Sequence, residues 1–201
     1  MNKTNKSWIQ KHINDPYVIQ AQKEGWRSRA VFKLKEVQLK DKVIKPGMRI
    51  VDLGAAPGGW SQYAAHCLNG TGHIVAIDLL PMDTIAGVEF IQGDFRDEAT
   101  LKQLMAAVGH EPIDLVMSDM APNFSGHKGI DQPRSMHLAE LALAFAEDVL
   151  SDKGQFLIKL FQGTEIDQYI QTCRERFKRV TIRKPKASRD KSREFYLLAQ
   201  R

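Results

Sequence analysis

The sequence predicts an α/β fold in which helices cover both faces of a mostly parallel sheet. The chain has 201 residues, of which 43% are hydrophobic and 26% charged, and this size and composition suit one globular domain. Five short, near-continuously apolar runs alternate with helical patterns, as expected of parallel strands that are buried on both sides. Two further strand patterns close the chain with no helix between them, which predicts an antiparallel pair.

Hydrophobic periodicity places the strands and helices of the middle and the end of the chain. The predicted strands are residues 48–54, 73–78, 88–92, 113–119 and 155–161, followed by the terminal pair 179–184 and 194–199. The predicted helices between them are residues 60–68, 98–108, 133–150 and 165–177. The third helix begins at Pro133, because proline is favoured in a first helical turn.

The N-terminal residues differ from the rest of the chain in that they predict helices only. These helices span residues 7–13, 17–24 and 29–39, and Ser28 is the expected cap of the last one. Pro46 and Gly47 end the segment before the first strand. We therefore expect a basic helical N-terminal extension over residues 1–46, within the same domain as the α/β region over residues 47–201.

Charge is distributed unevenly along the chain. Residues 1–46 hold 11 lysines and arginines against 4 acidic residues, and residues 174–201 hold 11 against 3. Residues 47–173 hold 7 against 17, so an acidic middle lies between two basic ends. Basic ends suit a polyanion such as a nucleic acid, whereas the acidic middle suits a ligand with cationic or hydroxyl-rich parts. Solvated surface lysines are the simpler alternative.

Several classes of protein do not fit the composition. Cys67 and Cys173 have neither a Cys-x-x-Cys nor a Cys-His spacing, so we expect no zinc site and a reducing compartment. The apolar runs are far shorter than the ~20 residues that span a bilayer. The polar, basic N-terminus lacks the apolar stretch of a secretory signal. We therefore expect a cytoplasmic protein without a membrane partner.

A glycine-rich turn follows the first predicted strand, where a ligand of an open α/β sheet normally binds. The segment 48–59 reads MRIVDLGAAPGG, with glycines at 54, 58 and 59 rather than in the G-x-G-x-x-G spacing of a dinucleotide site. Asp52 at the strand end would repel a pyrophosphate but suit a cationic amino group. We expect Asp52, Gly54 and Gly58 to contact the ligand.

An acidic residue also ends the second strand, and another follows the third. Asp78 could accept hydrogen bonds from both hydroxyls of a ribose, and Asp94 could accept one from the amine of adenine. Any one of them could be an ordinary turn residue. Together with the glycine turn, however, they describe a ligand with an amino group, a ribose and an adenine but no required phosphate. The sequence therefore predicts S-adenosylmethionine as the cofactor.

Three motifs resemble those of the FtsJ-type ribose 2′-O-methyltransferases. They are GWRSRAVFKL at 25–34, DLGAAPGGWSQ at 52–62 and SDMAPN at 118–123, and the resemblance covers nearly the whole chain. It implies a Rossmann-like methyltransferase fold with a seven-stranded sheet and an antiparallel last strand. It also implies methylation of a uridine ribose in 23S ribosomal RNA. We expect the substrate to be the assembled large ribosomal subunit, and naked RNA is the open alternative.

The same resemblance implies specific site residues. The family uses a Lys-Asp-Lys-Glu tetrad, which maps onto Lys33, Asp119, Lys159 and Glu194. Its cofactor contacts map onto Gly58, Trp60, Asp78, Asp94 and Asp119.

The residue types of the tetrad also suit methyl transfer when they are considered without the family resemblance. Lys159 interrupts an otherwise apolar strand, where a lysine is costly unless it is paired or functional. Methyl transfer to a 2′-hydroxyl requires an aligned oxygen and a group that takes its proton, and Lys159 is the candidate base. Alternatively, Lys159 stays charged and only steers the oxygen, while Glu194 holds Lys33 or the ribose. No metal is expected, because the positive sulfur already activates the methyl group.

Basic residues on both sides of the tetrad are candidates for RNA contact. They are Arg27, Arg29, Lys33 and Lys35 near the N-terminus, where Trp26 lies among them, and Lys184, Lys186, Arg189, Lys191 and Arg193 near the terminal hairpin. Such a rim would hold phosphates while one ribose enters the site. Trp26 could stack on a base, although a core position is at least as common for tryptophan. The predicted loop 123–132 carries His127 and Lys128 as weaker candidates.

Other functions fit the sequence less well. An amine methyltransferase would show a (D/N)PP(Y/F) turn after the fourth strand, where this chain has Asp119-Met120-Ala121-Pro122. A cytosine C5 enzyme needs a cysteine nucleophile there, and a dinucleotide oxidoreductase needs a different glycine spacing. The open alternative is a non-catalytic or dual-role RNA-binding factor in ribosome assembly with the same fold. We expect a monomer in either case.

Overall fold

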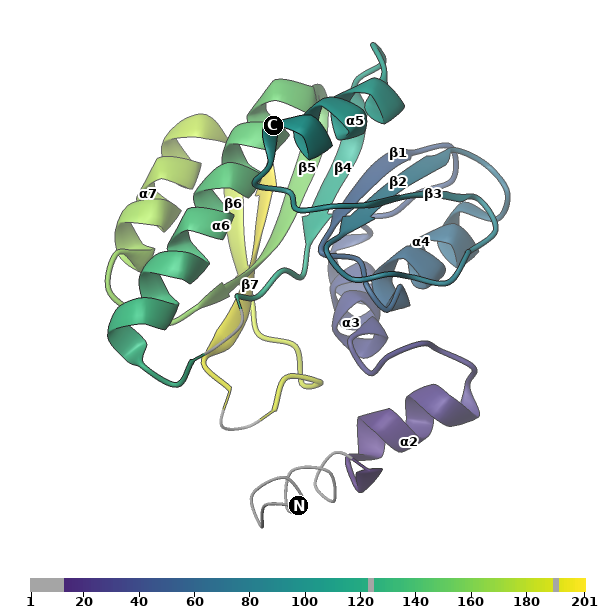
Figure 1. Ribbon diagram of the computed structural model, residues 1–201, viewed down its shortest axis with the longest axis horizontal. Helices are drawn as coiled ribbons and strands as arrows, with labels where there is room; N and C mark the ends of the chain where they lie inside the picture. The colour runs from purple at the N-terminus through teal and green to yellow at the C-terminus, as the bar shows by residue number, and fades with distance from the viewer. Residues whose placement is uncertain (1–12, 123–124, 190–191) are drawn as a thin grey trace.

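The computed structural model describes residues 13–122, 125–189 and 192–201, and a seven-stranded sheet forms its centre (Figure 1). The strands are β1 (Arg49–Leu53), β2 (His73–Asp78), β3 (Val88–Gln92), β4 (Ile113–Ser118), β5 (Leu150–Phe161), β6 (Arg179–Arg183) and β7 (Glu194–Gln200). Their order is β3-β2-β1-β4-β5-β7-β6, and β7 pairs antiparallel with both of its neighbours while the other pairs are parallel. The predicted α/β class, the strand count and the antiparallel terminal pair are confirmed.

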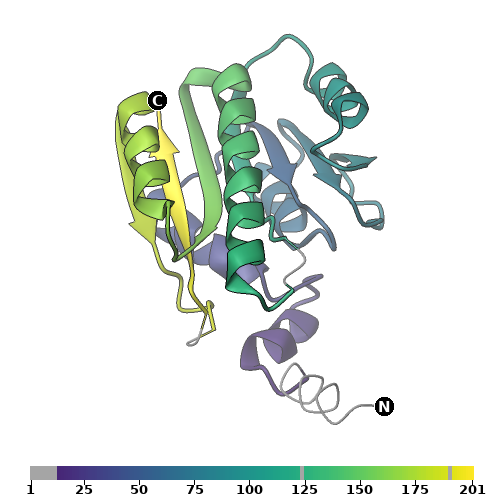
Figure 2. The same ribbon diagram turned by 60° about the vertical axis from the view of Figure 1, so that its left-hand side comes forward.

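Helices cover both faces of the sheet (Figures 1 and 2). Helices α5 (Glu98–Val108), α6 (Lys128–Val149) and α7 (Ile166–Arg176) lie on one face, and α3 (Val31–Asp41) and α4 (Gly59–Leu68) lie on the other. Helix α2 (Pro16–Lys23) extends from the α3 side toward the N-terminus. Of the six helices in the described residues, five thus cover the sheet, and α2 lies apart from it.

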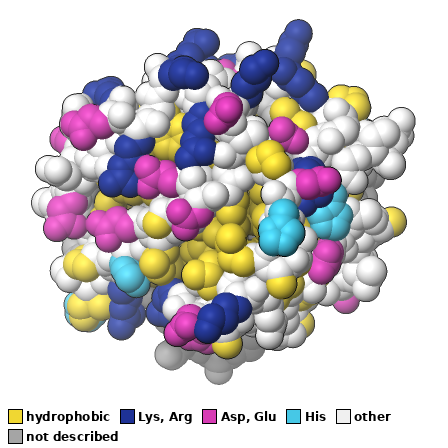
Figure 3. Space-filling model, turned by 90° about the horizontal axis from the view of Figure 1, so that it is seen from above, with side chains coloured by type: hydrophobic (Ala, Val, Ile, Leu, Met, Phe, Trp, Pro, Cys, Tyr) yellow, Lys and Arg dark blue, Asp and Glu magenta, His cyan; other side chains and the backbone are white. Residues whose placement is uncertain are grey.

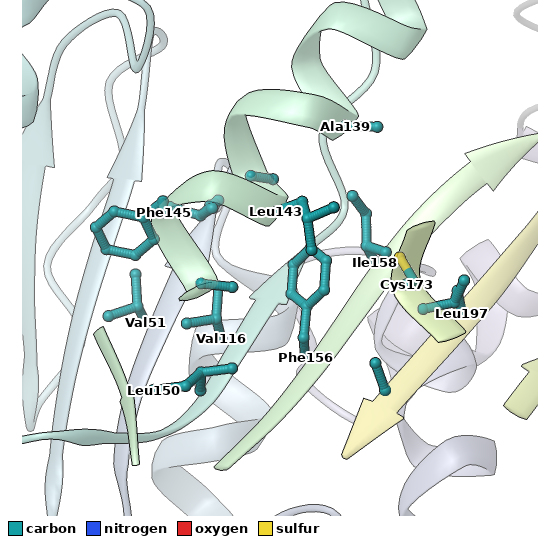
Figure 4. Packing of buried hydrophobic residues seen from close by; sticks show 14 of the residues in the cluster. Val51, Val116, Ala139, Leu143, Phe145, Leu150, Phe156, Ile158, Cys173 and Leu197 are labelled. Carbon is teal, nitrogen blue, oxygen red and sulfur yellow. The ribbon is translucent and has the colours of Figure 1, made fainter. Parts of the chain in front are cut away.

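The alternation of side chains along β1 explains why the strands are apolar on both faces. Val51 and Leu53 belong to the core under α5, α6 and α7, whereas Ile50 belongs to the core under α3 and α4. Figure 4 shows the larger of these cores, in which Leu143 of α6 lies beside Phe156 of β5. All five side chains are nearly inaccessible to solvent, which is why such strands have continuous apolar runs.

Two boundaries differ from the prediction. Helix α6 begins at Lys128 rather than Pro133, so residues 128–132 of the predicted loop are helical; residues 123–124 lie outside the described part. The Asp131 carboxylate accepts hydrogen bonds from the backbone N–H groups of Ser125 and Gly126, which fixes the turn before the helix. Strand β5 begins at Leu150, immediately after α6, and is longer than predicted.

The N-terminal helices also begin at other residues than predicted. Asp15 caps α2 by accepting a hydrogen bond from the Tyr17 N–H. Ser28 does not cap α3, which starts at Val31 without a side-chain cap; the Ser28 carbonyl instead accepts from the Val31 N–H at 3.3 Å. The predicted helix at residues 7–13 lies almost entirely outside the described residues.

The side of the molecule that faces up in Figure 1 carries both signs of charge. Figure 3 shows lysine and arginine side chains interspersed with aspartate and glutamate there. Helix α2 lies at the opposite side, which faces down in Figure 1. The upper side therefore lacks the uniform positive charge expected of an RNA-binding face. Among the described helices, none is both long enough and apolar enough to span a membrane.

Candidate active site

A cavity of about 590 Å³ opens at the carboxyl ends of the parallel strands. Gly54 follows β1, Asp78 ends β2, Asp94 follows β3 and Asp119 follows β4, and all four line this cavity. Its volume lies within the range of small-molecule sites. The structure therefore brings together four of the predicted cofactor residues at the edge of the sheet where α/β proteins bind ligands.

Gly54 allows the first and fourth strand ends to approach each other closely. Its φ of 80° lies in the left-handed region, and a Cβ at this position would lie 2.5 Å from the Met120 Cγ. Met120 also lines the cavity. Any side chain at residue 54 would displace this wall of the cavity.

Backbone hydrogen bonds fix the Asp78 carboxylate at the cavity wall. One oxygen accepts from the Ala56 N–H at 2.9 Å and the other from the Leu80 N–H at 2.8 Å. Each carboxylate oxygen has a second lone pair available, so Asp78 can still accept hydrogen bonds from a ligand. A pair of ribose hydroxyls is the ligand group that this geometry suits.

Asp94 is paired within the cavity with an arginine that the sequence analysis did not identify. The Arg96 Nη2 lies 2.5 Å from one Asp94 oxygen, and its Nε lies 2.9 Å from the other. These hydrogen bonds from Arg96 lower the pKa of Asp94 to about 2. Arg96 lines the cavity too, together with Arg134 and His137 of α6. No motif marked these three residues, because their places at the cavity depend on the connection after β3 and on how α6 packs against β4 and β5.

The tetrad forms two ion pairs next to the cavity. The Lys33 Nζ lies 2.6 Å from a Glu194 oxygen, and the Lys159 Nζ lies 3.1 Å from Asp119 Oδ1. The side chains of the two lysines are each only 8% exposed. Lys159 also donates to the backbone carbonyl of Asp119. The lysine that interrupts β5 is therefore paired, as its cost in an apolar strand predicts.

Tyr196 joins the two ion pairs. Its hydroxyl donates to Asp119 Oδ1 at 2.8 Å, and the Lys33 Nζ lies 5.7 Å from its ring centre. Tyr196 faces Lys159 across the β5–β7 ladder. Tyr196 was not among the predicted site residues, although it lies two positions after Glu194 and residues two apart on a strand share a face.

Burial and neighbouring charge act in opposite directions on Glu194. Burial raises the pKa of its carboxyl, but Lys33, with smaller effects of Ser188 and the Lys159 charge, outweighs burial, so the pKa lies below its ordinary value. Glu194 is therefore a carboxylate at neutral pH and balances the charge of Lys33. Burial also raises the pKa of Tyr196 well above its ordinary value, and the Asp119 charge adds to this effect, so its hydroxyl stays a donor.

Asp52 is not in the cavity. It follows Ile50 on the α4 face of β1, it is fully buried, and its Oδ2 accepts a hydrogen bond from the Ser61 hydroxyl at 2.6 Å. Burial raises the pKa of this carboxyl to about 7, against the effect of the Ser61 hydrogen bond. The structure thus places Asp52 behind the cavity rather than at the position expected for an amino-group contact, because α4 covers its strand face.

Gly58 and Trp60 also lie outside the cavity lining. Gly58 is the N-terminal cap of α4 with a φ of 102°. Trp60 is 3% exposed, donates from Nε1 to the Ala30 carbonyl at 2.9 Å and packs against Tyr196 with ring centres 5.6 Å apart. In this structure, Trp60 connects α4 to the start of α3 and to Tyr196, and it does not line the cavity.

Several basic residues that we expected to contact RNA bind protein groups. Arg29 pairs with Asp15 and donates to the Ala187 carbonyl, and Lys35 pairs with Glu24 at 2.7 Å. The Lys35 Nζ lies 4.5 Å from the Trp26 ring. These contacts stabilise the N-terminal helices, so fewer cations of this segment are free for phosphates than the sequence indicates.

The strand order and the location of the cavity place this protein in the class I methyltransferase fold, whose members use S-adenosylmethionine. Residues 26–201 match the family model described as FtsJ-like methyltransferase. The chain therefore belongs to the FtsJ-like methyltransferase family, and it is an S-adenosylmethionine-dependent enzyme of the RNA 2′-O-methyltransferase class.

Two solved structures are similar to this chain. A Plasmodium falciparum protein, provisionally named a ribosomal RNA methyltransferase, has a TM-score of 0.75 and 30% sequence identity over 87% of this chain and 97% of its own. A provisionally named methyltransferase from Streptococcus mutans, solved in complex with SAH, has a TM-score of 0.53 and 12% identity over 79% of this chain and 89% of its own. The second likeness supports the fold alone.

Proposed function

We propose that this protein transfers a methyl group from S-adenosylmethionine to the 2′-hydroxyl of a uridine ribose in 23S ribosomal RNA, within the large ribosomal subunit. The observation that carries the proposal is the position of Asp119, which lines the cavity and also pairs with Lys159. A ligand in the cavity would therefore lie beside the only lysine on the apolar part of β5. The ribosomal RNA substrate is supported by the name of the Plasmodium falciparum relative.

The residues of the cavity suit S-adenosylmethionine. Asp78 would hold the two ribose hydroxyls and Asp94 would accept from the adenine amine, while Gly54 leaves room for close approach. The cofactor supplies a methyl group that its positively charged sulfur already activates. Asp119 is a further acceptor at the same edge of the sheet and would face the cationic end of the cofactor.

Lys159 is the proposed proton acceptor for the ribose 2′-hydroxyl. Its contacts with the side chain and the backbone carbonyl of Asp119 hold Nζ at a fixed place. In its neutral form this amine can take the hydroxyl proton, and the Asp119 carboxylate then stabilises the ammonium that forms. Tyr196 keeps Asp119 in position through the bond from its hydroxyl. The side chains of the tetrad are largely buried, so water competes little with these contacts.

Lys33 and Glu194 are proposed to position the acceptor ribose. Both lie next to the Lys159 pair, since Glu194 begins β7 opposite Phe161, two residues after Lys159. Because Glu194 already neutralises Lys33, the pair can offer both a donor and acceptors to a sugar hydroxyl without adding net charge.

The RNA is proposed to approach over the β6–β7 loop and the N-terminal extension, residues 1–46. The exposed cations of that loop within the described residues include Lys186, Arg189 and Arg193. Arg189 lies 3.5 Å from Asp15, so the loop and the start of α2 are adjacent. Phosphate contacts from this side would place one ribose at the tetrad.

Transfer of labelled methyl to ribosomal particles tests the proposal. The wild-type protein should methylate large subunits from a strain that lacks the enzyme, and the label should resist alkaline cleavage because it lies on ribose. Lys159→Ala should reduce transfer by about 1,000-fold or more, as expected for loss of a general base that also orders the acceptor, while the Kd for S-adenosylmethionine changes little. Lys153→Ala, an exposed lysine on the same strand, is the matched control and should keep normal transfer.

Two outcomes would contradict the proposal. Normal turnover by Lys159→Ala would exclude Lys159 as the base. RNA binding without any methyl transfer by the wild-type protein would favour a ribosome assembly factor instead.

A further inference from the structure

Arg27 makes a set of contacts that differs from those of an RNA-binding arginine. It lies between α2 and α3, and its guanidinium donates to three backbone carbonyls, those of Pro57, Asp83 and Thr84, at 3.3, 2.6 and 2.8 Å. Two of these oxygens belong to the connection between β2 and β3, and the third belongs to the glycine-rich turn after β1. One side chain therefore fastens two loops that are separate in the sequence.

Both loops form parts of the cofactor cavity. Gly54 and Ala56 from the glycine-rich turn line it, and so do Leu79 and Leu80 from the β2–β3 connection. Leu79 and Leu80 are 56% and 62% exposed, so little protein packing holds them in place. The hydrogen bonds of the Arg27 guanidinium hold both loops on the side away from the cavity.

The packing around Arg27 is close on the side of the glycine-rich turn. A Cβ at Gly58 would lie 3.0 Å from the Arg27 Nη1 and 2.8 Å from side-chain atoms of Met82 and Ile85. The Arg27 N–H donates to the Gln62 side chain at 3.0 Å, and the Gln62 amide donates to the Gly25 carbonyl at 3.0 Å. These bonds attach the segment between α2 and α3 to α4, which begins directly after the turn.

Only an arginine can make these contacts from one side chain. Its planar guanidinium presents several donors in a fixed fork, whereas a lysine ammonium is a single point of charge on a flexible stem. These three carbonyls use three of the five N–H donors of Arg27 and fix the guanidinium against protein loops. This assignment differs from the one that the basic N-terminal sequence suggested.

We propose that Arg27 is a positioning residue for the cofactor, which holds the glycine-rich turn and the β2–β3 connection in the geometry that binds S-adenosylmethionine. The proposal rests on the proposed place of the cofactor in the cavity. It also gives the N-terminal extension a second role, because the segment that faces RNA then sets the cofactor affinity as well.

Calorimetric titration of S-adenosylmethionine into the full-length protein tests this role. Arg27→Ala should weaken binding about 10-fold, and Arg27→Lys should restore little of it, because one ammonium cannot replace the fork. In methyl transfer, the KM for S-adenosylmethionine should rise while kcat at saturation stays within about two-fold, a split that general loss of folded protein would not produce. The affinity for a ribosomal RNA fragment without cofactor should stay unchanged.

Two further variants distinguish a role of Arg27 from a general effect of losing an arginine and from an error in the proposed cofactor site. Arg201→Ala removes an arginine that also donates to two backbone carbonyls, those of Leu150 and Glu147, far from the cavity, and it should keep normal cofactor affinity. Asp78→Ala should weaken cofactor binding; if it does not, the proposed cofactor site itself is wrong.

The inference about Arg27 is overturned if Asp78→Ala weakens binding and Arg27→Ala does not. It is also overturned if Arg27→Ala weakens only RNA binding, or if Arg27→Lys binds the cofactor as the wild type does. If Arg27→Ala does not fold, the Arg27→Lys titration decides between the same outcomes.

Discussion

At the scale of single residues, Asp52 is a buried carboxyl whose protonation is coupled to folding. Burial raises its pKa to about 7, and the charges of Asp119 and Asp78 act in the same direction against the Ser61 hydrogen bond. Between about pH 4 and pH 7, the folded protein keeps a proton that the unfolded chain releases. The contribution of Asp52 to the free energy of unfolding therefore falls as the pH rises through this window.

Asp52→Asn should remove this pH dependence, because the amide is neutral throughout. We expect the free energy of unfolding of the variant, relative to the wild type, to increase by about 2–3 kcal/mol from pH 5 to pH 8. Urea denaturation of both proteins at the two pH values measures it, and the difference between the proteins cancels the other titrating groups. An equal difference at both pH values would show that Asp52 is not protonated in the folded protein.

Some residues of the candidate site were predictable from the sequence, and others were not. Lys159 was predictable, because a lysine in an apolar strand must have a partner, and that partner is Asp119. The carboxylates after β2 and β3 were predictable from their positions at strand ends. Arg96 and Arg27 were not, since both act through contacts that depend on loop conformation.

At the scale of elements, the β6–β7 loop is held against α3 by one carboxylate. Glu36 accepts hydrogen bonds from the N–H groups of Lys186 and Ala187, at 2.8 and 2.9 Å. Arg29 of the segment before α3 donates to the carbonyl of Ala187. The loop that carries the exposed cations is thus positioned by the helix that carries Lys33.

Glu36→Ala should loosen this loop without unfolding the sheet. Hydrogen bonds to a charged acceptor contribute about 1.5–3 kcal/mol, so the amides of Lys186 and Ala187 should exchange about 10-fold faster or more. Amide exchange followed by NMR measures this directly. Glu140→Ala, on the exposed side of α6, is the control and should leave both amides as they are. Unchanged protection in Glu36→Ala would mean that other contacts hold the loop.

Element boundaries were the least predictable part of the fold. The start of α6 was placed five residues too late, because Pro133 suits a first turn but is also tolerated further inside when its neighbours are anchored. Here Asp131 anchors them through Ser125 and Gly126. The prediction that Ser28 caps α3 was wrong for a similar reason. The turn before α3 is closed by backbone hydrogen bonds and not by a side chain.

At the scale of the whole molecule, the uneven charge of the chain predicts how RNA binding depends on salt. Each phosphate contact that a lysine or arginine makes contributes about 0.7–0.9 to the slope of log K against log salt concentration. Replacement of Lys186 and Arg193 by glutamine should therefore reduce the slope by about 1.4–1.8. Filter binding of a ribosomal RNA fragment at several salt concentrations measures it.

Two exposed cations elsewhere on the molecule provide the control for this experiment. Lys153 lies on β5 and Arg174 on α7, and both are exposed. Glutamine at these two positions changes the net charge by the same amount as the Lys186 and Arg193 pair, and the slope should stay as in the wild type. Equal slopes for both double variants would show that net charge, rather than a defined RNA surface, sets the affinity.

The whole fold was more predictable than its details for a physical reason. Strands buried on both faces need continuous apolar runs, so β1, β2, β4 and β5 are visible in the sequence. The edge strand β3 is only partly buried, although its apolar residues also predicted a strand. The cover of helices on both faces follows from the right-handed crossovers between parallel strands, whereas the sequence analysis predicted no strand order. How the N-terminal extension attaches to the cavity was not predictable, because it depends on hydrogen bonds between residues about 30 to 60 positions apart.

A crystal structure of the protein with S-adenosylmethionine tests the central claim most directly. The measured quantity is the position of the methyl carbon relative to Lys159 Nζ and Asp78. We predict that the ribose hydroxyls bind Asp78, that the adenine lies beside Asp94, and that the methyl group faces Lys159 across a space that fits one sugar. A cofactor bound outside this cavity, or a Lys159 side chain directed away from the methyl carbon, would contradict the proposed mechanism.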